Sequence, residues 1–198
     1  AWGFYPLDII RLVLMLAVTF WIGALGLAGG VLLFAKVHVP PELAIDPAYI
    51  KPIGGALLAL AILYLAVCWR ARGRPVLLFK KEFSLPTISI AIAQTAVACA
   101  DLLVAAACLF ALLPDSNISF VDFLPSYLLA QVAAVLTHVP GGVGVLEVIL
   151  MHIVHGISAE LLFAAVLVFR VLYYLIPLFI SILMLIVYEI KLQKRKQL

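Results

Sequence analysis

Three ionisable side chains lie inside stretches of this sequence that are otherwise apolar: Asp101, Glu147 and Arg170. Charge is costly in lipid, so such residues usually face the interior of a helical bundle or a water-filled cavity. Tyr173 and Tyr174 follow the arginine by three and four residues, and they share its face of a helix. A guanidinium is a rigid fork that matches phosphate or carboxylate, and tyrosines can hydrogen-bond the same group. The set indicates a buried site for an anionic group.

A glycine-rich break, PGGVGVLE from Pro140 to Glu147, interrupts a second apolar run. Broken backbone at membrane depth is tolerated only where it packs in protein or lines a wet cavity. A short helix that begins at Val143 would point its positive dipole end into the protein, which favours anions at Gly141, Gly142 and Gly144. In a second interpretation, the glycines only permit tight packing at a turn.

The polar residues also allow structural roles. Arg170 can form a structural bridge with Glu147 or Asp101, or it can bind an anionic head group directly, and both roles can coexist. Glu147 is interpreted equally as a structural partner and as a gating or substrate contact. For Asp101 a structural pair is favoured. We expect Gln94 and Gln131 to act as hydrogen-bond partners between helices.

Other classes of site have little support in the sequence. His138 stands before the break, and His152 and His155 follow it, but no further Cys/His cluster joins them, so we expect no metal site. The sequence has no Gly-x-Ser-x-Gly motif and no phosphate-loop or dinucleotide fingerprint. We therefore predict no catalytic residues and no cofactor, and expect this chain to be non-catalytic.

The composition indicates the elements that must position these residues. Of 198 residues, 67% are hydrophobic and 12% are charged, whereas soluble domains have about 45–50% and about 25%. We predict an all-α, polytopic transmembrane bundle that forms one integral membrane domain over residues 1–198. Because the first residue is alanine, we expect a C-terminal part of a longer membrane region. The predicted spans are residues 12–35, 52–69, 83–113 and 160–188.

Charge placement predicts the topology. The basic loop of residues 70–82 and the basic C-terminal tail are expected on the cytoplasmic side. The spans of residues 83–113 and 160–188 already supply the two crossings between these cytoplasmic segments. Residues 120–154 must therefore begin and end on the outer side of the membrane. They form either two full crossings or a re-entrant hairpin of residues 120–138 and 143–155, broken at Pro140–Gly144. The segment after the break offers roughly 18 Å of helix, against a hydrocarbon core of about 30 Å, which favours the hairpin.

Two motifs together resemble the membrane region of the lysylphosphatidylglycerol synthetase/flippase family, which includes the multiple peptide resistance factor of bacteria. They are HVPGGVGVLE from His138 to Glu147 and FRVLYYLIP from Phe169 to Pro177. Gln94, Asp101 and the Trp21-x-Gly pattern fit the same family, so the resemblance covers most of the chain. It implies a multi-pass protein of the bacterial inner membrane.

In the bifunctional members of that family, a soluble domain transfers lysine or another amino acid from tRNA to phosphatidylglycerol. The membrane domain then moves the lipid to the outer leaflet, where it repels cationic antimicrobial peptides. The resemblance implies a phospholipid substrate here, and a soluble aminoacyl-transferase domain as a partner in the parent chain. The basic residues cluster beside apolar runs, which suits cytoplasmic loops better than a nucleic-acid surface, so we expect no direct contact with nucleic acid. A homo-oligomer is possible.

We expect Arg170, Tyr173 and Tyr174 to bind the head group together with the N–H groups near the glycines. Glu147 or Asp101 would form an ion pair with a cationic head group, or would neutralise Arg170 when the site is empty. Two other functions stay open: a secondary transporter of a small anion or amino acid, and a non-transporting scaffold for a lipid synthase.

Overall fold

The computed structural model describes part of the chain in detail. The described backbone comprises residues 6–34, 47–72, 75–78, 81–114, 118–137, 139 and 142–196. Within these ranges the predicted all-helical membrane bundle is confirmed, with one short β-hairpin added. His138, which precedes the predicted break, and Pro140 and Gly141 within it lie outside the described residues.

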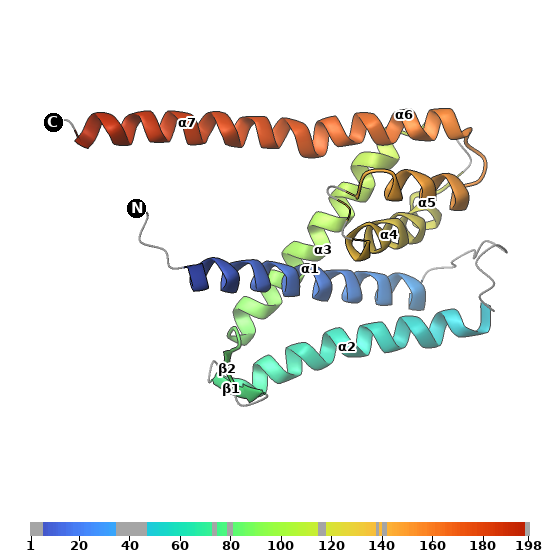
Figure 1. The fold of residues 1–198 in the computed structure, drawn as a ribbon. Coiled ribbons are helices and arrows are strands. Elements are labelled where there is room, and N and C mark those ends of the chain that lie inside the picture. Colours follow the sequence, from blue (N-terminus) through green and yellow to red (C-terminus); the bar gives the residue numbers. More distant parts are fainter. Residues whose placement is uncertain are drawn as a thin grey trace.

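The first two helices form an antiparallel pair. α1 spans Pro6–Phe34, and α2 spans Ile50–Ala71 after a short 3₁₀ turn at Pro47–Tyr49. They lie side by side (Figure 1) and are in contact. A Cβ added to Gly29 would stand 2.6 Å from the backbone nitrogen of Leu58, so the two backbones nearly touch there. Small residues allow this close approach in membranes.

The basic loop after α2 contains a short antiparallel hairpin. Strand β1, Pro75–Leu78, pairs with β2, Lys81–Ser84. Because these residues are in a strand, α3 spans Ile88–Ala111 and begins later than residue 83, where the sequence placed its start. α3 crosses α1 and reaches α6 (Figure 1), and it contacts both helices.

Two shorter helices follow. α4 spans Phe120–Leu136, and α5 spans Val145–Ile153. Asp122, which interrupts the apolar run in the sequence, belongs to the cap of α4: its backbone N–H donates to Ser119 Oγ at 3.2 Å, and that hydroxyl donates to its carboxylate at 2.6 Å. α4 is about 26 Å long and α5 about 14 Å long at the usual helical rise. The re-entrant hairpin stays a prediction.

The last part of the chain is one long helical rod (Figure 1), and a π-helical turn lies within it. α6 spans Ala159–Arg170, the π-helix η4 spans Val171–Leu175, and α7 spans Ile176–Lys196. The N–H of Ile176 donates to the carbonyl of Val171, the five-residue step of a π-helix. The wider turn begins directly after Arg170 and ends at Leu175, two residues before Pro177, which has no N–H to donate.

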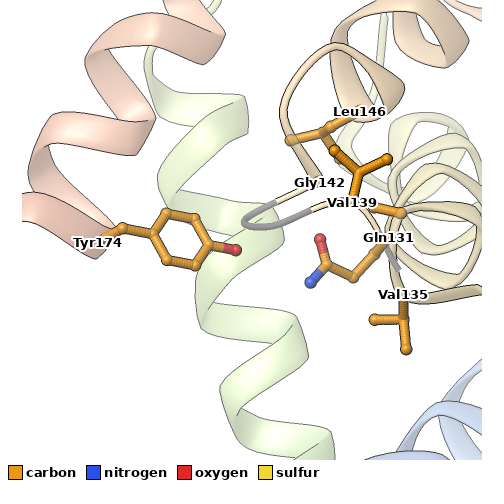
Figure 2. A pocket seen from close by; sticks show the side chains of 7 residues that line it. Gln131, Val135, Val139, Gly142, Leu146 and Tyr174 are labelled. Carbon is orange, nitrogen blue, oxygen red and sulfur yellow. The ribbon is translucent and has the colours of Figure 1, made fainter. Parts of the chain in front are cut away.

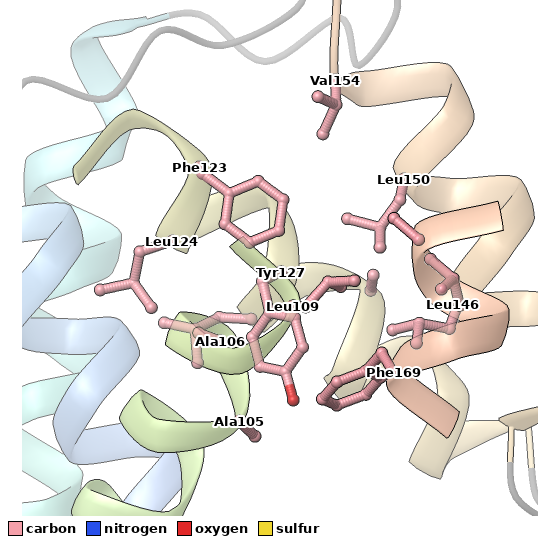
Figure 3. Close-up of a cluster of buried hydrophobic side chains, with 14 of the residues drawn as sticks. Ala105, Ala106, Leu109, Phe123, Leu124, Tyr127, Leu146, Leu150, Val154 and Phe169 are labelled. Carbon is pink, nitrogen blue, oxygen red and sulfur yellow. The ribbon is translucent and has the colours of Figure 1, made fainter. Parts of the chain in front are cut away.

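A buried apolar cluster holds α3, α4, α5 and α6 together. Figure 3 shows Leu109 of α3, Phe123 and Tyr127 of α4, Leu150 of α5 and Phe169 of α6 packed against one another. All five side chains are buried. The cluster therefore fixes the break before α5 relative to the end of α6, where the arginine lies.

The outer surface is apolar. Among the described residues, four helical segments are long and apolar enough to cross a membrane: Val13–Phe34, Ile50–Ala71, Ile88–Ala111 and Ala159–Leu192. Large apolar side chains are exposed along them, such as Leu63 on α2 and Met184 on α7. Lipid tails, rather than water, suit such a surface. The protein is a membrane-embedded helical bundle.

Candidate anion site at the helix break

The break before α5 depends on two glycines with positive φ. Gly142 has φ 59° and Gly144 has φ 85°, a region that glycine enters at little cost. A Cβ on Gly142 would also stand 2.6 Å from the Cβ of Ala134 on α4. The turn is closed by the N–H of Gly142, which donates to the carbonyl of Val139 at 2.8 Å. The lack of a side chain at Gly142 thus permits both the tight turn and the close contact with Ala134.

The carboxylate of Glu147 folds back onto the start of its own helix. Glu147 Oε2 accepts a hydrogen bond from the N–H of Gly144 at 2.8 Å, as in a capping box. Its negative charge lies near the positive end of the α5 dipole, which is favourable. The position that the sequence predicts for an external anion therefore holds an internal carboxylate.

Arg170, the last residue of α6, binds the carboxylate of Glu147. Its Nε donates to Glu147 Oε1 at 2.7 Å, and its Nη2 donates to Oε2 at 3.1 Å. Nη2 also donates to the carbonyl of Gly142 at 3.0 Å. The exposed fractions of the two side chains are 14% for Arg170 and 5% for Glu147, so the pair is largely buried. Of the two structural partners considered for Arg170, the observed ion pair is with Glu147.

Asp101 takes part in a different contact. The hydroxyl of Tyr173 donates to Asp101 Oδ1 at 2.5 Å, which ties η4 to α3. The ring of Tyr173 stacks on that of Phe169, with centroids 5.2 Å apart and planes 18° apart. The hydrogen bond between Tyr173 and Asp101 is thus a second polar link between helices, in addition to the ion pair of Glu147 and Arg170.

Tyr174 lines a cavity instead. The cavity has a volume of about 300 Å³. Its lining residues are Gln131, Ala134, Val135, Val139, Gly142, Leu146 and Tyr174. In Figure 2 the amide of Gln131 and the hydroxyl of Tyr174 point toward each other across the opening. The two adjacent tyrosines therefore differ in their contacts: Tyr173 binds Asp101 and Tyr174 lines the cavity. From the sequence we expected both to bind the same head group.

The role of Gln131 as a cavity residue was missed by the sequence interpretation, which treated it as a partner between helices. One signal was available. Gln131, Ala134 and Val135 have the spacing i, i+3 and i+4, which puts them on one face of α4. That face borders the break through the contact of Ala134 with Gly142. Gly141, also predicted for the site, lies outside the described residues.

The histidines near the break make local contacts. The Nδ1 atoms of His152 and His155 lie 2.9 Å and 3.0 Å from the carbonyls of Val148 and Ile153. Among the residues that the structure describes, no three His, Cys, Asp or Glu side chains are grouped as a metal site would need. The absence of a metal site in the chain stays a prediction.

Comparisons with known proteins place the chain among membrane proteins. No protein-family model matches it. The chain is 30% identical over 178 residues to the inner membrane protein YbhN of Escherichia coli, covering 89% of the chain and 56% of that protein. It is 34% identical over 184 residues to the uncharacterized protein slr0712 of Synechocystis, covering 90% of the chain and 56% of that protein. The chain spans about half the length of these two relatives.

A third similarity covers less of the chain. Over 94 residues it is 30% identical to a phosphatidylglycerol lysyltransferase of Staphylococcus epidermidis, which is 46% of this chain and 11% of that protein. The chain is thus related to an inner membrane protein and, over part of its length, to a phosphatidylglycerol lysyltransferase.

Proposed function

We propose that the chain moves an aminoacylated, lysyl-type or other anionic phospholipid between the leaflets of a bacterial inner membrane. The observation that carries the proposal is the convergence of Arg170 and the N-terminus of α5 on one carboxylate, that of Glu147. A lipid phosphate offers similar negatively charged oxygen acceptors. The relationship to a phosphatidylglycerol lysyltransferase supports a phospholipid as the substrate.

In the proposed mechanism, a lipid phosphate takes the place of the Glu147 carboxylate. Arg170 then remains paired throughout, because one anion replaces another, and no buried guanidinium is left without a counter-ion. The N–H group of Gly144, which donates to Glu147 in the structure, would contact the same phosphate. The released Glu147, or Asp101 on α3, would form an ion pair with a cationic aminoacyl group such as lysyl.

Movement in this mechanism would come from two irregular places in the backbone. The glycines before α5 can change their dihedral angles without a Cβ clash in the released state. The π-helix η4 interrupts the regular helix directly after Arg170, and Pro177 follows two residues after η4 ends. Irregular turns of this kind are often found at functional sites. Alternating access to the two leaflets would use both.

The biological role follows from the lipid. Displaying an aminoacylated lipid on the outer leaflet lowers the negative surface charge and so supports resistance to cationic antimicrobial peptides. The basic C-terminal end of α7, including Lys191, favours a cytoplasmic C-terminus. A soluble aminoacyl-transferase domain in the parent protein would supply the lipid, so that the parent would be a phosphatidylglycerol lysyltransferase and this chain its non-catalytic flippase part.

The proposal is tested in cells that carry Arg170→Ala. We expect outer-leaflet display of the lipid to fall to background in a leaflet-resolved lipid assay, while membrane insertion stays normal. Arg70→Ala, which removes an exposed arginine at the end of α2, is the matched control and should leave display unchanged. Unchanged display in the Arg170 variant would overturn the proposal.

A second candidate is a secondary transporter of a small anion or amino acid. The cavity of about 300 Å³ favours it, since this volume lies at the small end of ligand pockets. Uptake of a soluble anion coupled to a proton or sodium gradient would support this candidate. Lipid movement in proteoliposomes without such a gradient would argue against it.

A further inference from the structure

The carboxylate of Glu147 depends on one cation. Within the described part of the chain, Arg170 is the only charged side chain that contacts it, and its other hydrogen bond comes from the N–H of Gly144. Only 5% of the Glu147 side chain is exposed. A buried carboxylate is stable in its charged form only where a positive group stays beside it. Release from Arg170 therefore leaves a negative charge that needs a new partner.

The elements around α5 hold no second cation for this carboxylate. α4 and α6 pack against α5. None of the other titratable groups described on these helices or on η4 forms an ion pair or a hydrogen bond with Glu147. These groups are Asp122 and Tyr127 of α4, His152 of α5, His155 after it, Glu160 of α6, and Tyr173 and Tyr174 of η4. The acids and phenols carry no positive charge, and both histidines are exposed and contact backbone carbonyls instead.

The cavity beside the ion pair offers no cation either. Arg170 Nη2 donates both to Glu147 Oε2 and to the carbonyl of Gly142, which lines the cavity, so the carboxylate lies at the edge of this space. None of the described lining residues is charged. In Figure 2 the amide of Gln131 and the hydroxyl of Tyr174 point into the opening. These two groups can hydrogen-bond a neutral carboxylic acid, which donates and accepts, but they cannot balance the charge of a carboxylate.

The net charge of the incoming lipid therefore decides how the released acid is neutralised. An anionic lipid such as phosphatidylglycerol brings a phosphate to Arg170 and no positive group. Two negative groups would then share one guanidinium unless Glu147 accepts a proton. An aminoacylated lipid brings an ammonium group together with its phosphate. That ammonium group can pair with the ionised Glu147, so no proton is needed.

We infer that Glu147 takes up a proton when an anionic phospholipid replaces it at Arg170, and that it stays ionised when the lipid carries an aminoacyl group. The proton binds the carboxylate as the phosphate reaches the guanidinium, and it leaves when the ion pair forms again. Movement of an anionic lipid is thus coupled to protons, whereas movement of a lysyl lipid is not. This coupling rests on the proposed function and deepens it by naming the ion that accompanies one class of substrate.

The coupling is tested by counting protons during binding. The full chain in detergent is titrated with short-chain phosphatidylglycerol or short-chain lysylphosphatidylglycerol at about pH 6.5, where amino groups are charged. Calorimetry in two buffers that differ in their heat of ionisation gives the number of protons taken up. We expect about one proton for each phosphatidylglycerol bound and none for each lysyl lipid. Equal uptake with both lipids, or no uptake with phosphatidylglycerol, would overturn the coupling.

The affinities should show the same difference. Because a proton is taken up, binding of phosphatidylglycerol should weaken by about tenfold for each unit rise in pH, whereas the lysyl lipid should bind equally well while its amino groups stay charged. Glu147→Gln imitates the neutral acid, so it should remove the proton uptake and the pH dependence for phosphatidylglycerol. The same variant should weaken the lysyl lipid by roughly tenfold, because the partner of the ammonium group is lost.

Glu160→Gln, at an exposed position in the first turn of α6, is the matched control and should behave like the unmodified chain. Phosphatidylglycerol binding that still tightens at lower pH in Glu147→Gln would contradict the coupling. The proton count on the unmodified chain decides the matter even where Glu147→Gln does not fold.

Arg170→Ala separates the coupling from the proposed function, since this variant should bind neither lipid. If phosphatidylglycerol binding is lost in the variant but the unmodified chain takes up no proton, the proposed function survives and the coupling fails. If phosphatidylglycerol binds Arg170→Ala as tightly as the unmodified chain, the proposed lipid site fails, and the coupling fails with it.

Discussion

Glu147 and Arg170 lie 23 residues apart in the sequence and meet through two hydrogen bonds, at 2.7 Å and 3.1 Å. The same carboxylate accepts a hydrogen bond from Gly144 at the start of α5. The end of α6 and the start of α5 are therefore linked through one charged group. If the Glu147 side chain swings away from the arginine and from Gly144, both parts of the anion site become available together.

The first prediction concerns the stability of this ion pair. Glu147→Gln leaves a largely buried guanidinium without its counter-ion, which should cost about 3 kcal/mol. In a chain of this size the melting temperature should fall by roughly 6–12 °C. Glu160→Gln, at an exposed position in the first turn of α6, is the control. A thermal melt in detergent with equal shifts for the two variants would contradict a stabilising pair.

The second prediction concerns the contact between α1 and α2. Gly29→Ala would drive a Cβ to 2.6 Å from the backbone nitrogen of Leu58, and the helices must then separate. At the next position, Gly30→Ala meets no atom within 4 Å and removes a residue that weakens helices. We expect Gly29→Ala to lower the melting temperature, and Gly30→Ala to raise it or leave it unchanged. The reverse order would show that α1 and α2 do not cross there.

The third prediction concerns the link between Tyr173 and Asp101. Because their hydrogen bond ties η4 to α3, Tyr173→Phe and Asp101→Asn should not have additive effects on the free energy of unfolding. The coupling energy in a double-mutant cycle should be about 1–2 kcal/mol. The ring stacking on Phe169 is preserved in Tyr173→Phe, so packing is held constant. Additive effects would mean that the two side chains do not interact in the membrane.

The fourth prediction tests the re-entrant hairpin. Val143 is exposed beside the break, so Val143→Cys can be labelled wherever water reaches it. The hairpin predicts no reaction with an impermeant thiol reagent added from the cytoplasmic side, whereas two full crossings would put the break on that side. The background replaces Cys68, Cys99 and Cys108 by alanine. Arg70→Cys, in the last turn of α2 beside the basic loop, is the positive control, and equal labelling at Val143 would contradict the hairpin.

Much of the site could be predicted from the residue types. Charge in apolar stretches identified Glu147 and Arg170, since membrane burial requires a partner for each. Which acid pairs with the arginine could not be predicted, because it depends on how α5 and α6 pack around Phe169. The sequence also could not show that Glu147 caps its own helix and so occupies the predicted anion position.

The separation of the two tyrosines had no signal in the hydrophobic pattern. Regular helical spacing puts Tyr173 and Tyr174 on the face of Arg170, but the π-helix widens the turn directly after the arginine. Tyr173 consequently reaches Asp101, and Tyr174 reaches the cavity. The hairpin of β1 and β2 was missed for a similar reason: the positive charges of that loop indicate its side of the membrane, and they say little about backbone pairing.

The most direct measurement of the central claim is lipid movement in proteoliposomes that contain only the purified chain. Fluorescent phospholipid in the inner leaflet is followed as it becomes accessible to an impermeant quencher, with Arg170→Ala and Arg70→Ala reconstituted in parallel. Transport through the Arg170 site predicts movement well above protein-free vesicles for the unmodified chain and for Arg70→Ala, and none above background for Arg170→Ala. Equal movement with all three proteins, or no movement with the unmodified chain, would contradict the claim.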